Sequence, residues 1–396
     1  MEIGIVGKPN VGKSTFFSAA TLAPAEIADY PFTTIEANRG VTYVRAKCPH
    51  EELGIECNPN NAPCENGTRL VPVEMLDVAG LVPDAHKGRG LGNKFLDDLR
   101  QAKALIHIVD VSGGTDHEGN VVQLGTHDPL SDVQFLDTEI SQWIRSILEK
   151  GWKKVVRQVQ LDGLKVEKAI QERMTGLGFT DAMVLDSLRR METDETPMNW
   201  SEDDILRLAD NLRTVGKPMI VAANKCDVAP DENIKRLESL DDKIVVPTSA
   251  EAELALRRAA KSDLISYDVG DDHFEILDES GLNAKQLKGL EFMSNVLKKF
   301  GSTGIQKCVE EAVFNLLDMI VVYPVEDENK WTDKDGRVLP DAYLLRRGSN
   351  AKDLAYEVHT DLGDNFIRAI DGRTKRVLGA DHELKDGDII TIAARA

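Results

Sequence analysis

The sequence predicts an α/β protein with a mainly parallel sheet, a helical insertion and a small C-terminal β-grasp domain. Apolar runs lead into Gly7, Asp77 and Asn224, as parallel strands with polar loops at their carboxyl ends do. Between 131 and 213, apolar residues recur at helical spacing, which indicates a helical hairpin or short coiled coil. After residue 318, short β-prone runs alternate with glycine and aspartate turns. The expected domains are 1–130 together with 214–317, then the insertion 131–213, and finally 318–396.

The composition is that of an ordinary globular protein, with 42% apolar and 29% charged residues. No run approaches the roughly 18 apolar residues that a membrane span needs, so we expect a cytoplasmic protein without membrane contact. We also expect a monomer. The formal net charge of -19 repels polyanions, and a nucleic-acid partner would therefore need a local basic patch. A salt-rich cytosol is the other explanation for such an acidic surface.

The first apolar run, Ile3–Val6, leads into a loop that matches the pattern G-x-x-x-x-G-K-[ST], and a helix-like segment follows. In this strand–loop–helix context, glycines let backbone N–H groups wrap a phosphate at the positive end of the helix. Lys13 is expected to reach the β- and γ-phosphates as a catalytic residue, and Ser14 to bind Mg²⁺. The predicted nucleotide-binding residues of this loop are Gly7, Asn10, Val11, Gly12, Lys13, Ser14 and Thr15.

Two further motifs follow in the order that a GTPase requires. Asp77–Gly80 has the pattern D-x-x-G after an apolar segment, so Asp77 can hold the metal through water while Gly80 joins the nucleotide site. Asn224–Asp227 has the pattern N-K-x-D, whose final carboxylate can accept hydrogen bonds from guanine N1–H and the exocyclic amine. Together the motifs predict a P-loop domain of the Ras-like type. Its base-binding residues are expected to be Asn224, Lys225, Asp227, Ser249 and Ala250.

Two segments are candidate switches. In Tyr30–Ile35 a threonine hydroxyl is expected to complete the Mg²⁺ shell; Thr34 is the chosen ligand and Thr33 the reserve. A β-prone segment with incidental threonines is the alternative. The glycine-rich segment from Leu81 to Arg100 follows the metal-binding acid and suits a second switch, or is only a flexible loop.

The strings GKPNVGKST, YPFTTIEANRG, DVAGLVPDAHKGRGLGNKFLDDLRQA and NKCD together resemble the Obg superfamily of GTPases, in its YchF or Obg-like ATPase branch. Residues 318–396, which end in the stretch KDGDIITI, are similar to a TGS domain. The chain resembles an archaeal-type member with an intact N-K-x-D. The resemblance implies contact with the ribosome or RNA, and it is weakest over 134–213 and 254–301.

The resemblance and the residues disagree on the substrate. Better known members of this branch carry a degenerate base motif and prefer ATP, whereas adenine here would leave the Asp227 carboxylate unpaired. We therefore expect a Mg²⁺-dependent GTPase switch that binds GTP and GDP and acts on the translation machinery. The alternatives are an ATPase of the Obg-like type, and a nucleotide-gated RNA- or ribosome-binding module with negligible hydrolysis.

The usual residue that orients the attacking water is missing, because Leu81 stands where many GTPases place a glutamine. The resemblance implies three other sources of catalytic contact. Asn10 matches an asparagine that helps bind an activating K⁺. His117 is the nearest match to a mobile histidine, with His127 as reserve, although an ordinary solvated loop residue is the alternative for His117. An activating partner is the third source, and slow intrinsic turnover is expected.

Basic residues gather in the insertion and in the last domain. Both groups are either solvated faces or surfaces for RNA, which the resemblance supports. They are Lys150, Lys153, Lys154, Arg157, Lys165 and Lys168 in the insertion, and Arg373, Lys375 and Arg376 near the C-terminus.

Three cysteines and a histidine, Cys48, His50, Cys57 and Cys64, lie in a loop rich in proline and asparagine. Three sulfurs and an imidazole can complete a tetrahedral Zn²⁺ site. Eight and six residues separate the cysteines, which does not fit the short C-x₂₋₄-C pattern. Reduced thiols in an ordered loop are therefore the favoured interpretation, and zinc is the alternative.

Overall fold

The structure is a computed structural model of the 396-residue chain. It describes residues 1–22, 39–78, 98–191, 196–279 and 281–395. By its contacts the chain divides into two compact units, which are described separately below. The first unit comprises Met1, Thr21–Glu74 and Val309–Ala396, and the second comprises Glu2–Ala20 and Met75–Cys308. The three domain boundaries expected from the sequence stay predictions.

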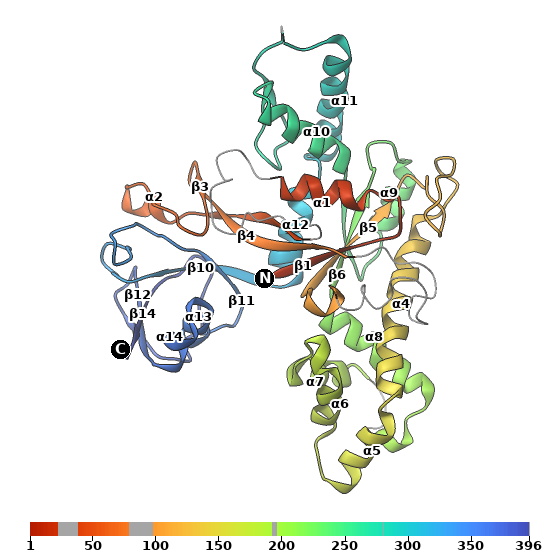
Figure 1. Cartoon of the computed structure of the whole chain (residues 1–396), viewed down its shortest axis with the longest axis vertical. Coiled ribbons are helices and arrows are strands. Elements are labelled where there is room, and N and C mark those ends of the chain that lie inside the picture. The colour runs from red at the N-terminus through yellow and green to blue at the C-terminus, as the bar shows by residue number, and fades with distance from the viewer. Residues whose placement is uncertain (23–38, 79–97, 192–195, 280, 396) are drawn as a thin grey trace. The chain divides into compact units, whose positions relative to one another are not determined.

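The second unit is built on parallel strands in the order β1-β5-β6-β7, and the carboxyl end of β4 lies on the other side of β1 (Figure 1). Their bounds are β1 Glu2–Val6, β4 Thr68–Asp77, β5 Ala104–Asp110, β6 Met219–Asn224 and β7 Ile244–Thr248. Every residue of β5 and β6 is buried. These strands are near-continuous apolar runs because a parallel sheet is covered on both faces. The carboxyl ends of β5, β6 and β7 meet in register, with Asp110 opposite Asn224 and Asn224 opposite Thr248.

Other elements of the second unit flank this sheet. The helices are α1 Lys13–Thr21, α9 Asp231–Glu238, α10 Ala250–Lys261, α11 Ala284–Phe300 and α12 Ile305–Glu310. The last two residues of α12 belong to the first unit. A small two-stranded ribbon is formed by β8 Ile265–Ser266 and β9 Glu275–Ile276. Leu256 of α10 and Leu297 of α11 share an apolar cluster with Ile265 of the ribbon.

The insertion is helical, as predicted. Its elements are α4 Pro129–Glu149, α5 Trp152–Leu161, α6 Val166–Met174, η3 Thr175–Leu177, α7 Asp181–Arg189, η4 Pro197–Asn199 and α8 Glu202–Gly216. The pair α4 and α8 packs side by side and comes nearest to the expected helical hairpin. Ser201 begins α8 with a capping box that includes Asp204. Apolar side chains such as Ile144 and Leu208 join a core that continues to Leu105 of the sheet, so the insertion packs as part of this unit.

The first unit contains a hairpin and the C-terminal β-grasp sheet. The hairpin elements are β2 Arg39–Lys47, α2 His50–Leu53, β3 Cys64–Glu65 and most of β4. After the π-helical turn η5 Glu311–Leu316 follow β10 Met319–Val325, β11 Tyr343–Arg346, α13 Ala351–Val358, α14 Thr360–Asp364, β12 Phe366–Asp371, β13 Val377–Leu378 and β14 Ile389–Ala394. The sheet order is β11-β10-β14-β12-β13, and Leu354 of α13 packs into its core. This is the β-grasp arrangement that the sequence predicted.

Within the described ranges, no helix combines the length and the apolar character that crossing a membrane requires.

Candidate nucleotide-binding site

The phosphate loop has a backbone that only glycine can form at two positions. A Cβ atom on Gly12 would lie 2.4 Å from Nδ2 of Asn224, and one on Gly7 would lie 2.7 Å from the carbonyl oxygen of Ile108. Gly12 has φ +94° and Asn10 has φ +63°, both in the left-handed region. The chain thus turns sharply between β1 and α1, where the first N–H groups of the helix have no partner within the helix.

Lys13 and Asp77 meet directly at the amino end of α1. Nζ of Lys13 donates to Oδ1 of Asp77 at 2.8 Å and to the carbonyl oxygen of Val78 at 2.9 Å. The Ser14 side chain is exposed beside them. A serine hydroxyl and a carboxylate are hard oxygen donors, the type that Mg²⁺ prefers, so the residues present fit this metal. Thr34 and Gly80, with the two candidate switches up to residue 97, lie outside the described residues.

Asn224 connects the phosphate loop to the loops that follow β6 and β7, which are called the base loops below. Its Nδ2 donates to the carbonyl oxygen of Val11 at 2.9 Å, while its Oδ1 accepts from the backbone N–H of Ala250 at 3.0 Å. The side chain is 2% exposed. A buried amide with both ends satisfied is held in one orientation. Asn224 is therefore a scaffold residue that sets the spacing of three loops.

Lys225 forms a second tie in the same place. Its backbone is left-handed, with φ +64°, and its Nζ donates to the carbonyl oxygen of Asn10 at 2.9 Å and to Oδ2 of Asp110 at 2.7 Å. Asp110 is fully buried and also accepts from the Ser112 hydroxyl and from Thr115 Oγ1. No local sequence motif predicted this role of Asp110, although Asp110 ends a strand just as Asp77 does.

Asp227, the predicted acceptor for the base, has no hydrogen-bond or ion-pair partner among the residues that the structure describes. The side chain is half-buried. Ser249, another predicted base contact, is buried and begins α10, where its Oγ accepts from the N–H of Ala252. Its N–H donates to the carbonyl oxygen of Thr303 at 2.9 Å. Within the described part of the chain, the Asp227 carboxylate therefore keeps its capacity to accept hydrogen bonds from a ligand.

A buried network supports the base loop from behind. Glu253 of α10 is fully buried and accepts from Tyr267 Oη at 2.8 Å, Thr303 Oγ1 at 2.5 Å and Arg257 Nε at 2.6 Å. Burial and then the charge of Glu253 raise the pKa of Tyr267. The network fixes Thr303, whose carbonyl oxygen holds Ser249.

His117 lies on an exposed turn beside the phosphate loop. Nδ2 of Asn10 donates to the carbonyl oxygen of Gly119 at 2.9 Å, and among the described residues no donor to Oδ1 of Asn10 is found. Asp116 closes the turn by accepting from the N–H of Asn120 at 2.8 Å. The His117 side chain is exposed to solvent. The turn brings His117 close to the phosphate loop in the fold, and its catalytic role stays a prediction.

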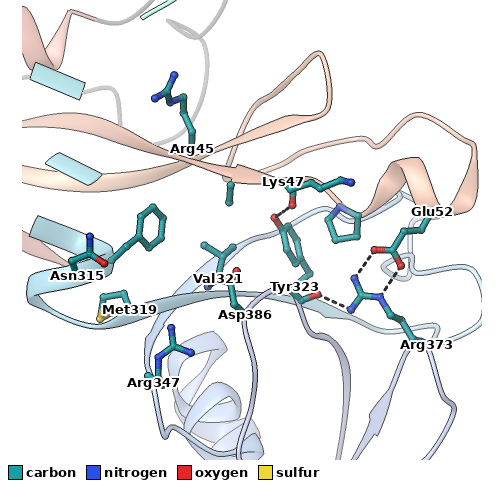
Figure 2. Close-up of a pocket in the computed structure, with 14 residues that line it drawn as sticks. Arg45, Lys47, Glu52, Asn315, Met319, Val321, Tyr323, Arg347, Arg373 and Asp386 are labelled. Carbon is teal, nitrogen blue, oxygen red and sulfur yellow. Dashed lines mark hydrogen bonds and ion pairs between the residues drawn. The ribbon is translucent and has the colours of Figure 1, made fainter. Parts of the chain in front are cut away.

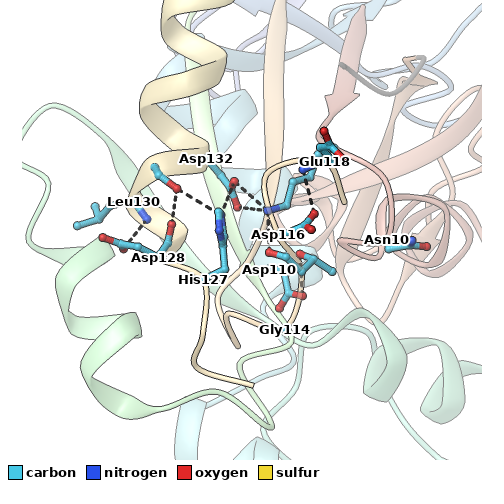
Figure 3. Close-up of polar contacts among 12 residues, drawn as sticks. Asn10, Asp110, Gly114, Asp116, Glu118, His127, Asp128, Leu130 and Asp132 are labelled. Atoms are coloured by element: carbon cyan, nitrogen blue, oxygen red, sulfur yellow. Dashed lines mark hydrogen bonds and ion pairs between the residues drawn. The ribbon is translucent and has the colours of Figure 1, made fainter. Parts of the chain in front are cut away.

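A buried ion cluster, missed by the sequence analysis, anchors the start of the phosphate loop (Figure 3). Nζ of Lys8 donates to Asp132 Oδ1 at 2.9 Å and to the carbonyl oxygen of Thr115 at 3.0 Å, and Lys8 is 6% exposed. His127 Nε2 lies 2.9 Å from the same carboxylate oxygen. This contact gives His127, the reserve catalytic histidine, a structural partner at the start of α4.

The basic residues of the two predicted RNA surfaces differ in how many contacts they make with the protein. In the insertion, all six predicted lysine and arginine side chains are exposed. In the first unit, Arg373 is held by Glu52 through two contacts of 2.7 Å and by the carbonyl oxygen of Gly387 at 2.8 Å (Figure 2). These residues line a cavity of about 490 Å³. Lys375 donates to the carbonyl oxygens of Glu328 and Gly372, and Arg376 is exposed.

The four residues of the cysteine-rich loop converge in the first unit. The ligand atoms of Cys48, His50, Cys57 and Cys64 all lie within 4.8 Å of one another. None of these three cysteines forms a disulfide bond in the structure.

Three family models match the chain. Residues 2–152 match the 50S ribosome-binding GTPase model, and residues 222–327 match the G4 motif-containing domain of Obg-like GTPases of the YGR210-like type. Residues 331–394 match the TGS domain.

Similar proteins match over nearly the whole chain. A GTP-binding protein of Methanocaldococcus jannaschii is 54% identical over 397 residues, covering 100% of this chain and 99% of the relative. The ribosome-binding ATPase YchF of Bacillus subtilis is 28% identical over 416 residues, covering 98% of each chain. The crystal structure of a GTP-binding protein from Pyrococcus horikoshii has 45% identity and a TM-score of 0.79, with 100% of both chains covered.

A phosphate loop between β1 and α1, a base motif at the end of β6 and a C-terminal β-grasp sheet define a P-loop GTPase with a TGS domain. Within that class, the chain belongs to the Obg superfamily, in its YchF branch.

Proposed function

We propose that this chain is a Mg²⁺-dependent switch protein that binds and hydrolyses GTP and acts on the ribosome. The choice of base depends on one observation. Asn224 and Lys225 are fixed by contacts to the phosphate loop, whereas the Asp227 carboxylate next to them has no hydrogen-bond partner among the described residues. Guanine offers two N–H donors to such a carboxylate, and adenine would leave it unpaired.

The phosphate site supports a triphosphate with bound metal. Lys13 now neutralises Asp77, and phosphate oxygens would compete for the lysine when a nucleotide binds. Asp77 would then be free to hold the Mg²⁺ shell together with Ser14 and Thr34. Mg²⁺ supplies charge neutralisation at the β- and γ-phosphates. The protein's own contribution is to position the phosphates with Lys13 and the loop amides.

Ribosome action is supported by the names of similar proteins. The family model over residues 2–152 is described as a 50S ribosome-binding GTPase, and the Bacillus subtilis relative is named a ribosome-binding ATPase. That second name also keeps ATP as the rival substrate. The exposed basic residues of the insertion offer a local attraction for RNA in an acidic protein.

The base preference is tested by replacing one carboxylate oxygen. In Asp227→Asn, the amide offers a donor where guanine needs an acceptor, so affinity for GTP should fall roughly 100-fold. Affinity for xanthosine triphosphate, which has a carbonyl in place of the guanine amine, should rise. Titrations of GTP, GDP, ATP and xanthosine triphosphate with both proteins measure these changes. Tighter ATP binding by the wild type, with no change in the variant, would establish the ATPase alternative.

Hydrolysis is tested by multiple-turnover phosphate release. We expect slow release by the protein alone and faster release with ribosomes, because no glutamine follows the D-x-x-G motif. Replacing Na⁺ by K⁺ should stimulate the wild type but not Asn10→Ala, since Asn10 Oδ1 is the expected cation ligand. If GTP binds tightly but ribosomes and K⁺ leave release at the level of Lys13→Ala, the protein is a nucleotide-gated binding module instead.

A further inference from the structure

Four metal-binding side chains from one loop meet in the first unit. Cys48 follows β2, His50 begins α2, Cys57 lies in the loop after α2 and Cys64 begins β3. The sulfur atoms of Cys48 and Cys57 are 3.8 Å apart, and the sulfur of Cys64 is 3.7 Å from Nδ1 of His50. All four ligand atoms lie within 4.8 Å of one another.

These distances fit a tetrahedral zinc ion. Zn–S bonds of about 2.3 Å at the tetrahedral angle place two sulfurs about 3.8 Å apart, and a Zn–N bond of about 2.0 Å places sulfur and nitrogen about 3.5 Å apart. A disulfide needs two sulfurs about 2.05 Å apart, so Cys48 and Cys57 are not joined by one in the structure. Thiolate and imidazole ligands favour zinc over Mg²⁺, which prefers oxygen.

The fold brings the ligands together through backbone contacts that do not involve the side chains. The N–H of Cys48 donates to the carbonyl oxygen of Gly67 at 2.8 Å, which ties the end of β2 to the β3–β4 turn. That turn contains Asn66 and Gly67, both with positive φ. Gly54, also left-handed, caps the C-terminal end of α2, and the chain then returns toward Cys57. The wide sequence spacing of the cysteines is therefore compatible with one site.

The surroundings balance the charge of such a site. A zinc ion with three thiolates and a neutral imidazole carries a net charge of -1, since the ion contributes two positive charges. The guanidinium of Arg69 is fully buried, and its Nη2 lies 3.3 Å from the sulfur of Cys48. Arg69 also donates to the carbonyl oxygens of Ala62 and Leu339. A buried arginine beside a thiolate is the kind of partner that surrounds metal ligands.

We propose that Cys48, His50, Cys57 and Cys64 form a structural Zn²⁺ site. Four protein ligands close the coordination shell and leave no position for water or substrate, so the site is structural and not catalytic. The proposal replaces our sequence-based preference for reduced thiols without a metal. It does not depend on the proposed nucleotide or on ribosome binding.

The metal has a specific structural task in this unit. The loop after Cys57 pairs with the segment before β11: the N–H of Asn58 donates to the carbonyl oxygen of Val338 at 2.9 Å, and the Asn61 side chain exchanges two hydrogen bonds with the Ala342 backbone. Ile55, just before Cys57, is 50% exposed, whereas Ala62 later in the loop is fully buried. Zinc would hold the loop in the conformation that contacts the C-terminal β-grasp part.

The first test is metal content. The full-length protein, purified under reducing conditions, should contain one equivalent of zinc by elemental mass spectrometry. Cys57→Ser should lose it, whereas Cys308→Ala, which removes a buried cysteine elsewhere, should retain it. Zinc absent from the wild type even after incubation with ZnCl₂, or equally present in Cys57→Ser, would overturn the proposal. Iron in place of zinc would also overturn it.

A second measurement on the wild type alone guards against misfolded variants. Replacement of zinc by Co²⁺ should produce the intense visible bands of tetrahedral cobalt with thiolate ligands. A chelator, used without nucleotide and with Mg²⁺ restored afterwards, should abolish hydrogen-exchange protection at the amides of residues 58–61 while that of β5 remains. Unchanged exchange at these residues, or an octahedral cobalt spectrum, would count against the site. A mass loss of two hydrogens per chain would indicate a disulfide instead.

Discussion

At the scale of single residues, the nucleotide site is defined by close approaches that leave no room for substitution. Asn224 lies against Gly12, and the Lys225 ammonium spans from Asn10 to Asp110. Two non-glycine residues, Asn10 and Lys225, adopt left-handed backbone conformations within this set. Such conformations cost of order 1–3 kcal/mol and persist only where the surroundings impose them. The geometry of the phosphate loop is thus maintained by the base loop.

Gly12→Ala should test this coupling. The new Cβ would meet the Asn224 amide at 2.4 Å in a left-handed backbone, so the loop must shift. We expect roughly 10- to 100-fold weaker binding of GTP, which corresponds to about 1–3 kcal/mol of strain. Titration of wild type and variant with a fluorescent GTP analogue measures the change.

Gly289→Ala is the matched control for that substitution. Gly289 lies in α11 with no atom within 4 Å of an added Cβ. This variant should bind GTP normally and gain about 0.5–1 kcal/mol of stability, because alanine favours a helix. Equal GTP affinity in all three proteins would show that the Asn224 contact does not shape the phosphate loop.

Sequence reasoning at this scale found the residues that belong to local motifs and missed those that do not. Gly12, Lys13 and Asn224 stand at fixed positions relative to a strand, and the strand itself is visible in the apolar pattern. The ion pair of Lys8 and Asp132 joins positions 124 apart. No local pattern marks such partners, because they meet only through the packing of α4 beside the phosphate loop.

At the scale of elements, the central strand β5 carries a histidine whose burial has a measurable consequence. His107 is 4% exposed, and within the described structure no partner is found for its Nδ1. Burial, followed by the nearby charges of Lys243 and Lys8, lowers the pKa of His107 to about 3. The neutral form of the ring is therefore the one favoured at this buried position of the parallel sheet.

The stability of the protein should therefore fall in mild acid. The unfolded histidine takes up a proton near pH 6.5 while the folded one does not, so the stabilising contribution is complete above pH 6.5 and declines as the pH falls toward 3. Between pH 7.5 and 5.5 the wild type should lose about 1.4 kcal/mol more unfolding free energy than His107→Leu. Urea unfolding at both values measures it. Parallel pH profiles for the two proteins would mean that the pKa of His107 is the same in the folded and the unfolded protein.

The strands and helices could be predicted from the sequence, whereas the arrangement of the cysteine-rich loop could not. The strands β1, β6 and β10 follow from dense apolar runs, and the insertion follows from helical periodicity. The convergence of Cys48 and Cys64 could not be seen, because it depends on the β3–β4 turn and on the return of the chain after α2. The C-x₂₋₄-C spacing rule applies to short zinc knuckles, in which the ligands come from a single tight turn, and this loop is longer.

At the scale of the whole molecule, charge is distributed unevenly. The chain has a formal net charge of -19, yet Lys153, Lys154 and Arg157 lie exposed on α5 of the insertion. A ribosomal RNA surface repels the protein overall, so an encounter would favour the local basic face. The insertion is therefore the part of the second unit that we expect to contact the ribosome.

The charge-reversal variant Lys153→Glu/Lys154→Glu/Arg157→Glu tests this expectation. Loss of three phosphate contacts should weaken ribosome binding at least tenfold and lower the slope of log affinity against log salt by about three. Co-sedimentation with ribosomes across a salt series, with GTP analogue present, gives both quantities. GTP affinity itself should stay unchanged, because α5 packs on α4, α6 and η4 of the insertion.

A second triple variant separates a local contact from the effect of net charge. Lys261→Glu/Lys285→Glu/Lys288→Glu changes the charge by the same amount at exposed positions on α10 and α11. If the basic face of α5 docks on RNA, this control should keep the wild-type salt slope and lose affinity only slightly through long-range repulsion. Equal losses in both variants would show that total charge governs binding, and the docking surface would then lie elsewhere on the molecule.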